Sequence, residues 1–365
     1  MGIAGGAIVV ASVTYYLLSD KTNFVREDSK NQTKPIAFLR PDERAILSLA
    51  SLAPSGHNTQ PWFVQYIEPY HWIIGNDKTR WLNGVDPTQR ETMLSIGAFM
   101  QTLENAANSL GYKCAFNVLA THNQDENVVS VSLSKSGATA QYEVEKIRQR
   151  RTIRSNFLGD TLRQNDLADL TNGQADFLHF IPNNAHEYKL LNEQTIEANR
   201  VQAYRNAAQA ELADWIRFSS KDVAMHCDGL TLAGMEITGL PAWYLRNFYG
   251  KKDVMKTGFR QQSIDKVKQQ VATSAGWMLI TSKGNTVNDL LETGMRMQRL
   301  FLDVRARNIA IHPMTQILEE TTVIPSLHQS IGISDPVQFI LRMGYVKSYP
   351  VPVSLRRPVE SFVRL

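Results

Sequence analysis

Cysteine, net charge and long apolar runs are all scarce in this sequence. Cys114 and Cys227 are the only cysteines among 365 residues, which excludes a disulfide scaffold and a thiolate metal site and leaves the redox compartment undecided. Lys and Arg together number 39 against 35 for Asp and Glu, so the formal net charge of +4 is too small to indicate a nucleic-acid partner. The hydrophobic fraction of 43% is that of an ordinary globular protein.

Motifs of several common enzyme classes are also missing. The chain has no Gly-x-Ser-x-Gly nucleophile elbow and no Walker loop, so hydrolase and NTPase interpretations have no residues to rest on. The histidines are scattered, and the segment Met225–Gly229 resembles a metal site only superficially, so we expect no metal. The glycines at residues 2–6 follow no strand, which argues against a dinucleotide loop.

One uncharged stretch lies at the N-terminus. Gly2–Leu18 carries no charge and is followed by Asp20 and Lys21. The stretch has the length of a short membrane span and the texture of an export signal, although no Lys or Arg precedes it. A buried N-terminal helix is the alternative. We therefore expect a membrane-anchored or exported, periplasmic bacterial protein, with a cytoplasmic protein as the alternative.

Two helical segments indicate an internal duplication. Leu94–Gly111 and Leu291–Asn308 share a pattern at a constant offset that superimposes Gly97 on Gly294. A glycine inside a helix costs about 1 kcal/mol and therefore needs a packing reason. Strand candidates lie on both sides of these helices, at residues 63–75, 127–134, 276–284 and 337–345. Helix-rich stretches lie at residues 187–218 and 264–273.

The pattern predicts an α+β protein of two fused halves that form a pseudo-dimer around antiparallel or mixed sheets with flanking helices. We expect the apolar segment and a polar linker at residues 1–35, the first half at 36–145 and the second half at 146–365. The second half includes a helical insertion at about 187–270.

An unusual corner, PSGHNTQPW, occupies Pro54–Trp62. Ser55 and Gly56 let the backbone approach a flat ligand closely. Asn58 and Gln60 offer amide donors and acceptors for a ring edge. Trp62 is either a wall against an aromatic ligand or an ordinary core residue.

A basic cluster, RQRRTIRSNF, follows at residues 148–157. If the cluster opens a helix, Arg151 and Arg154 share a face, and Thr152 can present its hydroxyl to the same target. Guanidinium groups bind phosphate bidentately, although a charge run is also often a solvated face. Arg356 and Arg357 near the C-terminus are either a polar tail or a second clamp on the same phosphate. A planar heterocycle with a phosphate tail, such as FMN, would use both the corner and the arginines.

These motifs resemble those of the FMN-dependent nitroreductase superfamily. PSGHNTQPW is similar to its Pro-Ser-x-x-Asn-x-Gln-Pro-Trp segment, RRTIR to its Arg-Arg-Ser-x-Arg phosphate motif and LRRPVE to its basic closing segment. The motif order and DPTQRE, at residues 86–91, resemble the Acg-type branch, in which two nitroreductase-like halves are fused. The resemblance covers roughly residues 40 to 365.

The resemblance implies the roles of individual residues. Arg150, Thr152, Arg154 and Arg356 would surround the phosphate, with Arg151 and Arg357 as further neighbours. Ser55, Gly56, Asn58 and Gln60 would border the ring, and Pro313, Thr315 and Gln316 would lie beside the flavin N5 edge. Only one complete set of motifs is present, so we expect one FMN per chain and a degenerate second site.

The implied activity is NAD(P)H-dependent two-electron reduction of a nitroaromatic or quinone-like acceptor, by ping-pong hydride transfer through flavin N5. The resemblance implies no catalytic side chain, because the cofactor carries the chemistry. The alternative is an FMN-storing or redox-sensing protein with little turnover, in which the insertion at Glu197–Asp222 acts as a lid. A membrane-tethered interaction protein without a cofactor would leave the corner and the arginines unexplained. Further oligomerisation is open.

Overall fold

Two antiparallel or mixed sheets and a pair of central helices build the molecule. In this computed structural model, residues 36–137, 143–320, 322 and 331–365 are described. The predicted apolar segment Gly2–Leu18 and the linker at 24–35 lie outside them. Within the described ranges, no helix has the length and apolarity needed to cross a membrane.

The first sheet has the strand order β11-β1-β2-β4-β3. Its strands are β1 (Trp62–Glu68), β2 (His71–Asn76), β3 (Tyr112–Val118), β4 (Asn127–Lys135) and β11 (Val363–Arg364). The pairing of β1 with the C-terminal β11 is parallel and the other pairings are antiparallel. The C-terminus therefore returns to the sheet that the first half of the chain forms.

The second sheet has the order β5-β8-β10-β9, and all its pairings are antiparallel. Its strands are β5 (Leu178–Pro182), β8 (Gly276–Thr281), β9 (Ile309–Pro313) and β10 (Val337–Tyr345). A two-stranded ribbon joins β6 (Ile216–Arg217) to β7 (Leu230–Thr231).

The helices fall into three groups. Those of the first half are α2 (Pro41–Ala50), α3 (Arg90–Ser109) and α4 (Val144–Gln149), with short 3-10 turns η2 (Gly56–Asn58) and η3 (Lys78–Arg80). Those of the second half are α5 (Gln164–Thr171), α12 (Val287–Asp303) and α13 (Gln316–Glu319), with η4 (Val304–Arg307) and η5 (Val359–Ser361). The insertion holds α6 (His186–Tyr204), α7 (Asn206–Trp215), α8 (Ser220–His226), α9 (Gly239–Phe248), α10 (Lys251–Val254) and α11 (Thr257–Val271).

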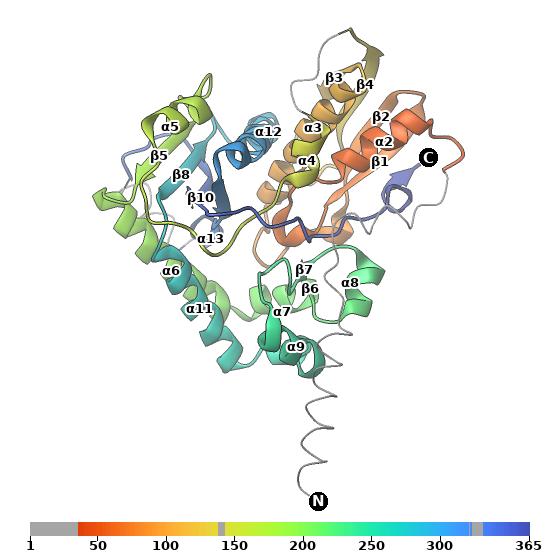
Figure 1. Ribbon diagram of the computed structural model, residues 1–365. Helices are drawn as coiled ribbons and strands as arrows, with labels where there is room; N and C mark the ends of the chain where they lie inside the picture. Colours follow the sequence, from red (N-terminus) through yellow and green to blue (C-terminus); the bar gives the residue numbers. More distant parts are fainter. Residues whose placement is uncertain (1–35, 138–142, 321, 323–330) are drawn as a thin grey trace, which may run out of the picture.

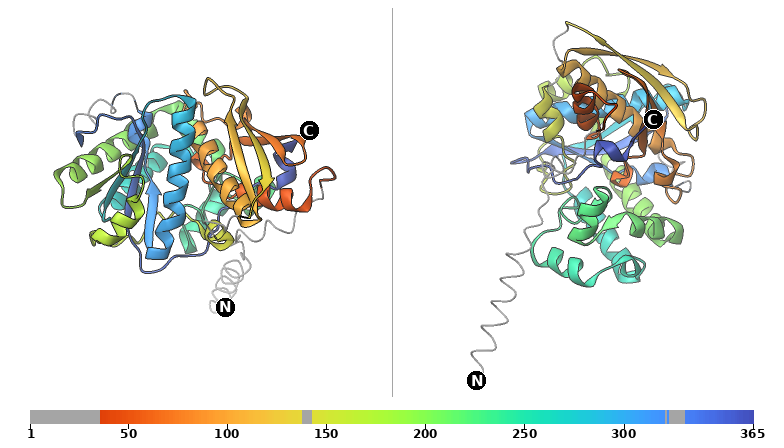
Figure 2. Two further views of the ribbon diagram at one scale, coloured as in Figure 1. Left: turned by 90° about the horizontal axis from the view of Figure 1, so that it is seen from above. Right: turned by 90° about the vertical axis from the view of Figure 1, so that its right-hand side faces the viewer.

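The two halves repeat one topology, which confirms the predicted duplication. The order α2, β1, β2, α3, β3, β4 in the first half matches α5, β5, β8, α12, β9, β10 in the second. The sheet orders β1-β2-β4-β3 and β5-β8-β10-β9 correspond strand for strand. The helical insertion lies between β5 and β8, and Figures 1 and 2 show its helices gathered beside the two sheets.

The central helices α3 and α12 cross at the two predicted glycines. A Cβ atom on Gly97 would lie 2.1 Å from the carbonyl oxygen of Leu291, and one on Gly294 would lie 2.1 Å from that of Leu94. The contact is thus reciprocal, as in the two-fold interface of a homodimer. Figure 2 shows the two helices side by side between the sheets. One hydrophobic core contains residues of both helices and both sheets.

Two local predictions were wrong. The strand candidate at residues 63–75 is a hairpin, because Pro69 and Tyr70 turn the chain and Tyr70 adopts a φ of 65°. The arginine cluster does not open a helix, since α4 ends at Gln149 and Arg150 has a ψ of 129°. The backbone N–H of Ile153 donates to the carbonyl of Ile311 on β9, which draws the segment into an extended path.

Candidate functional site

Two buried arginines converge from distant parts of the chain. Arg150 donates to the carbonyl of Leu52 at 3.3 Å, and Arg356 donates to the carbonyl of Ala53 at 3.2 Å. Both residues are about 4% exposed. Since Leu52 and Ala53 immediately precede Pro54, the structure brings the arginine cluster, the C-terminal motif and the PSGHNTQPW corner together.

These guanidiniums retain donors without acceptors. The Nε and Nη1 of Arg150 and the Nε of Arg356 are buried and have no hydrogen-bond partner in the part of the chain that the structure describes. Burial lowers the pKa of Arg150 to about 10. Burial, and then the positive charge of Arg150, lower the pKa of Arg356 well below its usual value. Within the described ranges no carboxylate pairs with either arginine, so no protein group balances the charge of these two buried cations.

The PSGHNTQPW corner has an unusual backbone. His57, Asn58 and Gln60 all have positive φ angles, of 45°, 55° and 53°. The Ser55 hydroxyl accepts from the backbone N–H of Gln60 at 2.9 Å, which closes the turn. Such left-handed conformations are costly for residues other than glycine and are often found at ligand sites.

The corner also contains buried acceptors and donors without partners. The Nδ1 of His57 and the Oδ1 of Asn58 have no hydrogen-bond partner. The side-chain amide of Asn58 donates to the carbonyls of Gly229 and Leu355, at 3.2 and 3.3 Å. Asn58 therefore joins the first half to both the insertion and the C-terminal tail.

Gln60 is fully buried and links the insertion to the C-terminal segment. Its amide donates to the carbonyl of Cys227 at 3.0 Å, and its side-chain oxygen accepts from the backbone N–H of Arg357 at 2.9 Å. Trp62 is also fully buried and lies 4.9 Å from the ring of Phe99 between centroids. Trp62 is therefore a core residue, the second of the two predicted alternatives.

Arg357 points away from the arginine pair. Its guanidinium donates to the carbonyls of Gln60 and Trp62, at 2.8 and 2.6 Å, and lies 3.9 Å from a carboxylate oxygen of Asp77. Burial lowers its pKa to about 9, and Arg80 adds to the effect. The structure thus brings Arg356 to Arg150 and separates Arg357 from both.

Arg154 lies farther along the same extended segment and contacts His312. The two side chains are 2.9 Å apart, and the Nε of Arg154 donates to the carbonyl of Gly234 at 3.1 Å. Burial, and then Arg154, lower the pKa of His312 well below its usual value. A neutral His312 can therefore accept from Arg154 through Nε2, while its buried Nδ1 has no partner.

Glu236 of the insertion binds the extended segment that carries Arg151, Arg154 and Ser155. Its carboxylate accepts from the backbone N–H of Arg154 at 3.1 Å and from the Ser155 hydroxyl, and lies 3.5 Å from the guanidinium of Arg151. Arg151 is thereby engaged in an ion pair. Thr152 is half-buried in the same segment.

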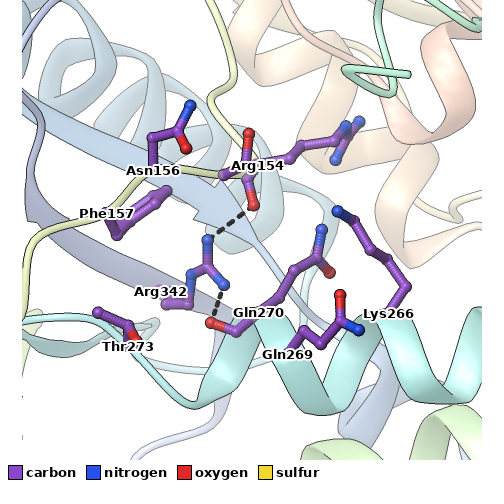
Figure 3. Close-up of a pocket in the computed structure, with 9 residues that line it drawn as sticks. Arg154, Asn156, Phe157, Lys266, Gln269, Gln270, Thr273 and Arg342 are labelled. Atoms are coloured by element: carbon purple, nitrogen blue, oxygen red, sulfur yellow. Dashed lines mark hydrogen bonds between the residues drawn. The ribbon is translucent and has the colours of Figure 1, made fainter. Parts of the chain in front are cut away.

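Arg154 also lines a cavity of about 220 Å³, whose lining residues are drawn in Figure 3. Arg342, which is 1% exposed, donates to the backbone carbonyls of Arg154 and Gln270 there. The side chain of Lys266 lies on the same side as that of Arg154. The volume is below the roughly 300–1,000 Å³ of typical cofactor pockets, and neither Arg150 nor Arg356 lines the cavity. Sequence reasoning missed Lys266, which has no motif around it.

The three residues predicted near β9 have different surroundings. Pro313 ends β9 opposite Leu341. The Thr315 hydroxyl lies 3.2 Å from a carboxyl oxygen of Glu91 and 3.1 Å from one of Glu319. Gln316 has a buried side-chain oxygen without a partner.

A group of acidic residues surrounds Thr315, and the sequence did not predict it. Burial, and then Glu91, raise the pKa of Glu319 well above its usual value. The same two causes raise the pKa of Asp86 to about 7. Glu91 also lies at the corner, since a Cβ atom on Gly56 would come within 3.3 Å of its carboxyl oxygen. DPTQRE contained two of these residues, but nothing in the sequence linked them to Glu319.

Comparisons with known proteins point to one family. No family model matches the chain. Over 341 residues the chain is 21% identical to probable NAD(P)H nitroreductase PigM of a Serratia species, which covers 85% of this chain and 90% of that protein. This relative confirms the resemblance to nitroreductases that the motifs predicted.

Among solved structures, similar chains have low overall scores. The FMN-dependent nitroreductase NfnB of Mycobacterium smegmatis, solved with NADPH, is 14% identical with a TM-score of 0.39 and covers 60% of this chain and 96% of its own. A nitroreductase-like protein of Bacillus cereus is 11% identical with a TM-score of 0.35 and covers 62% and 98%. A protein of Anabaena variabilis described as a nitroreductase is 10% identical with a TM-score of 0.36 and covers 88% and 92%.

Proposed function

We propose that this relative of the nitroreductases is an NAD(P)H-dependent oxidoreductase that binds one FMN per chain between its two halves. The observation that carries the proposal is the pair of buried guanidiniums, Arg150 and Arg356, which have unpartnered N–H groups and no carboxylate partner among the described residues. A phosphate dianion would accept from both arginines and cancel their repulsion.

The residues that would hold FMN come from both halves. Arg150, Thr152 and Arg356 would hold the phosphate, and Ser55, Gly56 and Asn58 would border the ring. Arg154, Pro313, Thr315 and Gln316 would line the ring from the second half. The unpartnered Nδ1 of His57, Oδ1 of Asn58 and Nδ1 of His312 supply the hydrogen-bonding groups that a flavin ring edge needs.

Gln60, Arg151 and Arg357 have a different part in this proposal. Each is engaged by protein groups: Gln60 by Cys227 and Arg357, Arg151 by Glu236, and Arg357 by backbone carbonyls. We assign them the walls of the site, which they hold in place, rather than contact with the phosphate.

When bound, FMN supplies two-electron chemistry by accepting a hydride from NAD(P)H and passing it to an acceptor. The protein's own contribution is electrostatic. Arg154 would present positive charge to the ring, which favours a negatively charged reduced ring, and Lys266 lines the neighbouring cavity together with Arg154 (Figure 3). His312 is neutral and holds Arg154 in place. We propose a nitroaromatic or quinone-like acceptor and a ping-pong order, since donor and acceptor would use one site in turn.

A second candidate is an FMN store or redox sensor, and two contacts of the insertion favour it. The backbone N–H of Gly229 donates to the carbonyl of Asn58 at 3.2 Å, and Gln60 bonds to Cys227. The loop of the insertion at residues 227–236 therefore lies on the corner and on the Arg154 segment. The expected lid was placed slightly earlier in the chain, at Glu197–Asp222.

An ion-pair group fixes this loop. Asp228 is 5% exposed and pairs with both Arg80 and Arg217, the latter at 2.7 Å. Both guanidiniums also lie over the ring of Trp215, at 5.5 and 5.4 Å. A loop held this firmly would restrict access of NAD(P)H, which is what a storage protein requires.

Anaerobic reduction followed by turnover separates the two functions. The purified protein is loaded with FMN, mixed with NADH or NADPH, and followed by the loss of flavin absorbance. Addition of a nitroaromatic or a quinone then tests steady-state oxidation of the nucleotide. Reduction with sustained turnover supports the oxidoreductase, whereas a bound flavin that neither nucleotide reduces supports storage.

A further inference from the structure

Thr315 connects two carboxyl groups through a single hydroxyl. Its Oγ1 lies 3.2 Å from an oxygen of Glu91 and 3.1 Å from an oxygen of Glu319. A hydroxyl has one proton to donate, so it cannot satisfy two carboxylates. It can satisfy both groups only by donating to one and accepting from the other, which requires that one carboxyl group is protonated.

The surroundings decide which carboxyl group carries the proton. Glu91 lies 3.2 Å from the guanidinium of Arg90 and in the first turn of α3, where the helix dipole stabilises a negative charge. Glu319 has no ion-pair partner among the described residues, and its second oxygen accepts only from a neutral donor, the side-chain amide of Gln202 on α6. Glu319 is therefore the protonated group and Glu91 the carboxylate, and the high pKa of Glu319 agrees with this assignment.

The ionised end of this chain of groups faces the PSGHNTQPW corner. A Cβ atom on Gly56 would lie 3.3 Å from the second carboxyl oxygen of Glu91. Next to it, the imidazole of His57 has a buried Nδ1 without a partner, and Glu91 partly opposes the lowering of its pKa. An unpartnered buried nitrogen beside Glu91 indicates that a ligand contacts this end.

We propose that Glu319, Thr315 and Glu91 form a proton relay that ends at the ring-facing corner and supplies the proton that accompanies each hydride passed to the acceptor. The Thr315 proton moves to Glu91 while the Glu319 proton moves to the Thr315 oxygen. Thr315 is unchanged, Glu91 becomes the acid that protonates the acceptor, and Glu319 becomes a carboxylate. Glu319 keeps some exposed surface, so solvent water returns the proton. The relay rests on the proposed function.

Other charged groups around the relay set its pH dependence. Asp86, which accepts from the backbone N–H groups of Glu91 and Thr92, repels a second negative charge on α3. Arg90 opposes that effect. His57 faces the relay from the corner, and Arg205 of the insertion is engaged by Glu320.

Infrared spectroscopy of the FMN-free and FMN-loaded protein tests the relay without depending on activity. We expect protonated-carboxyl absorption at neutral pH from Asp86, whose pKa is about 7, and a second component that disappears in Glu319→Gln and shifts in frequency in Thr315→Val. Asp86→Asn identifies the first component, and the exposed Glu193→Gln, on the same helix as Gln202, is the matched control that should leave both components unchanged. A spectrum that Glu319→Gln leaves unchanged would overturn the relay even in a protein that binds FMN.

Kinetics give the second readout. Thr315→Val and Glu319→Gln should each slow acceptor reduction about a hundredfold, the lower end of the roughly hundred- to ten-thousandfold range for general acid catalysis. The solvent isotope effect on that step should also rise, which a purely structural role would not cause. Unchanged acceptor reduction in both variants contradicts the relay. Failure of FMN to bind contradicts the proposed function instead, while the infrared band still tests the carboxyl pair.

Discussion

The guanidiniums of Arg150 and Arg356 donate to the carbonyls of consecutive residues, Leu52 and Ala53. One arginine follows the first half of the chain and the other lies near its C-terminus. Burial, and then the positive charge of Arg150, lower the pKa of Arg356 well below its usual value. Such an arrangement is unfavourable unless an anion joins it, and that requirement leads to the first two predictions.

Removing one arginine should weaken FMN binding. We expect Arg356→Met to raise the dissociation constant about ten- to a hundredfold, because a hydrogen bond to a charged group contributes about 1.5–3 kcal/mol. Titration followed by flavin fluorescence measures the change. Arg163→Gln is the matched control, since the Arg163 side chain is 80% exposed and its removal should leave binding unchanged.

The same variant should have the opposite effect on the FMN-free protein. Arg356→Met removes one of two buried cations that repel each other, so the free energy of unfolding without FMN should stay equal or increase. Urea unfolding with and without FMN measures both values. A variant that is clearly less stable without FMN would show that Arg356 stabilises the fold by itself.

Acid should reveal the burial of His57. Burial lowers its pKa from 6.5 to about 4, so between these values the unfolded chain binds more protons than the folded one. The contribution of His57 to the free energy of unfolding is fully present above pH 6.5 and is lost as the pH falls towards 4. At pH 5 the loss is about 2 kcal/mol. Asn tolerates the positive φ of residue 57, so His57→Asn removes the titration without straining the turn.

Comparison of the wild type with His57→Asn isolates the effect of His57 titration on stability. Asp86, with a pKa raised to about 7, acts in the opposite direction, because its folded form binds the extra proton between pH 7 and 3.8. That contribution is common to both proteins. We therefore expect His57→Asn to lose about 2 kcal/mol less than the wild type between pH 8 and 5. Parallel stability curves would contradict the burial of a neutral His57.

The crossing of α3 and α12 should not tolerate side chains at its glycines. Gly97→Ala and Gly294→Ala should each lower the free energy of unfolding by about 1–3 kcal/mol, because the new methyl group meets a backbone carbonyl at 2.1 Å. Gly258→Ala on α11 is the control: a Cβ there meets nothing within 4 Å, and the helix should gain up to about 1 kcal/mol. Equal effects at the three positions would contradict the close crossing.

The sequence predicted the duplication because its evidence is local. A glycine in an apolar helix implies close packing, and Gly97 and Gly294 occupy equivalent places in two similar patterns. The arginine segment was harder to predict, since its extended path depends on a hydrogen bond between Ile153 and Ile311 on a distant strand. Helical spacing says nothing about such a partner.

In the candidate site, too, local features could be predicted from the sequence and features that depend on tertiary contacts could not. The PSGHNTQPW corner could be found as a candidate because its small and amide residues are contiguous. The opposite directions of the Arg356 and Arg357 side chains could not be predicted from the sequence, since each depends on hydrogen bonds to backbone carbonyls of the first half. Glu319 and Lys266 approach the site only through tertiary packing, so no spacing in the sequence connects them to it.

A comparison of FMN with riboflavin tests whether Arg150 and Arg356 hold a phosphate, because the two ligands differ only in that group. FMN should bind at one per chain, and riboflavin, which leaves Arg150 and Arg356 without an anion, should bind at least a hundredfold more weakly. Equal affinities for the two ligands, or no binding of FMN, would contradict a phosphate site at these arginines.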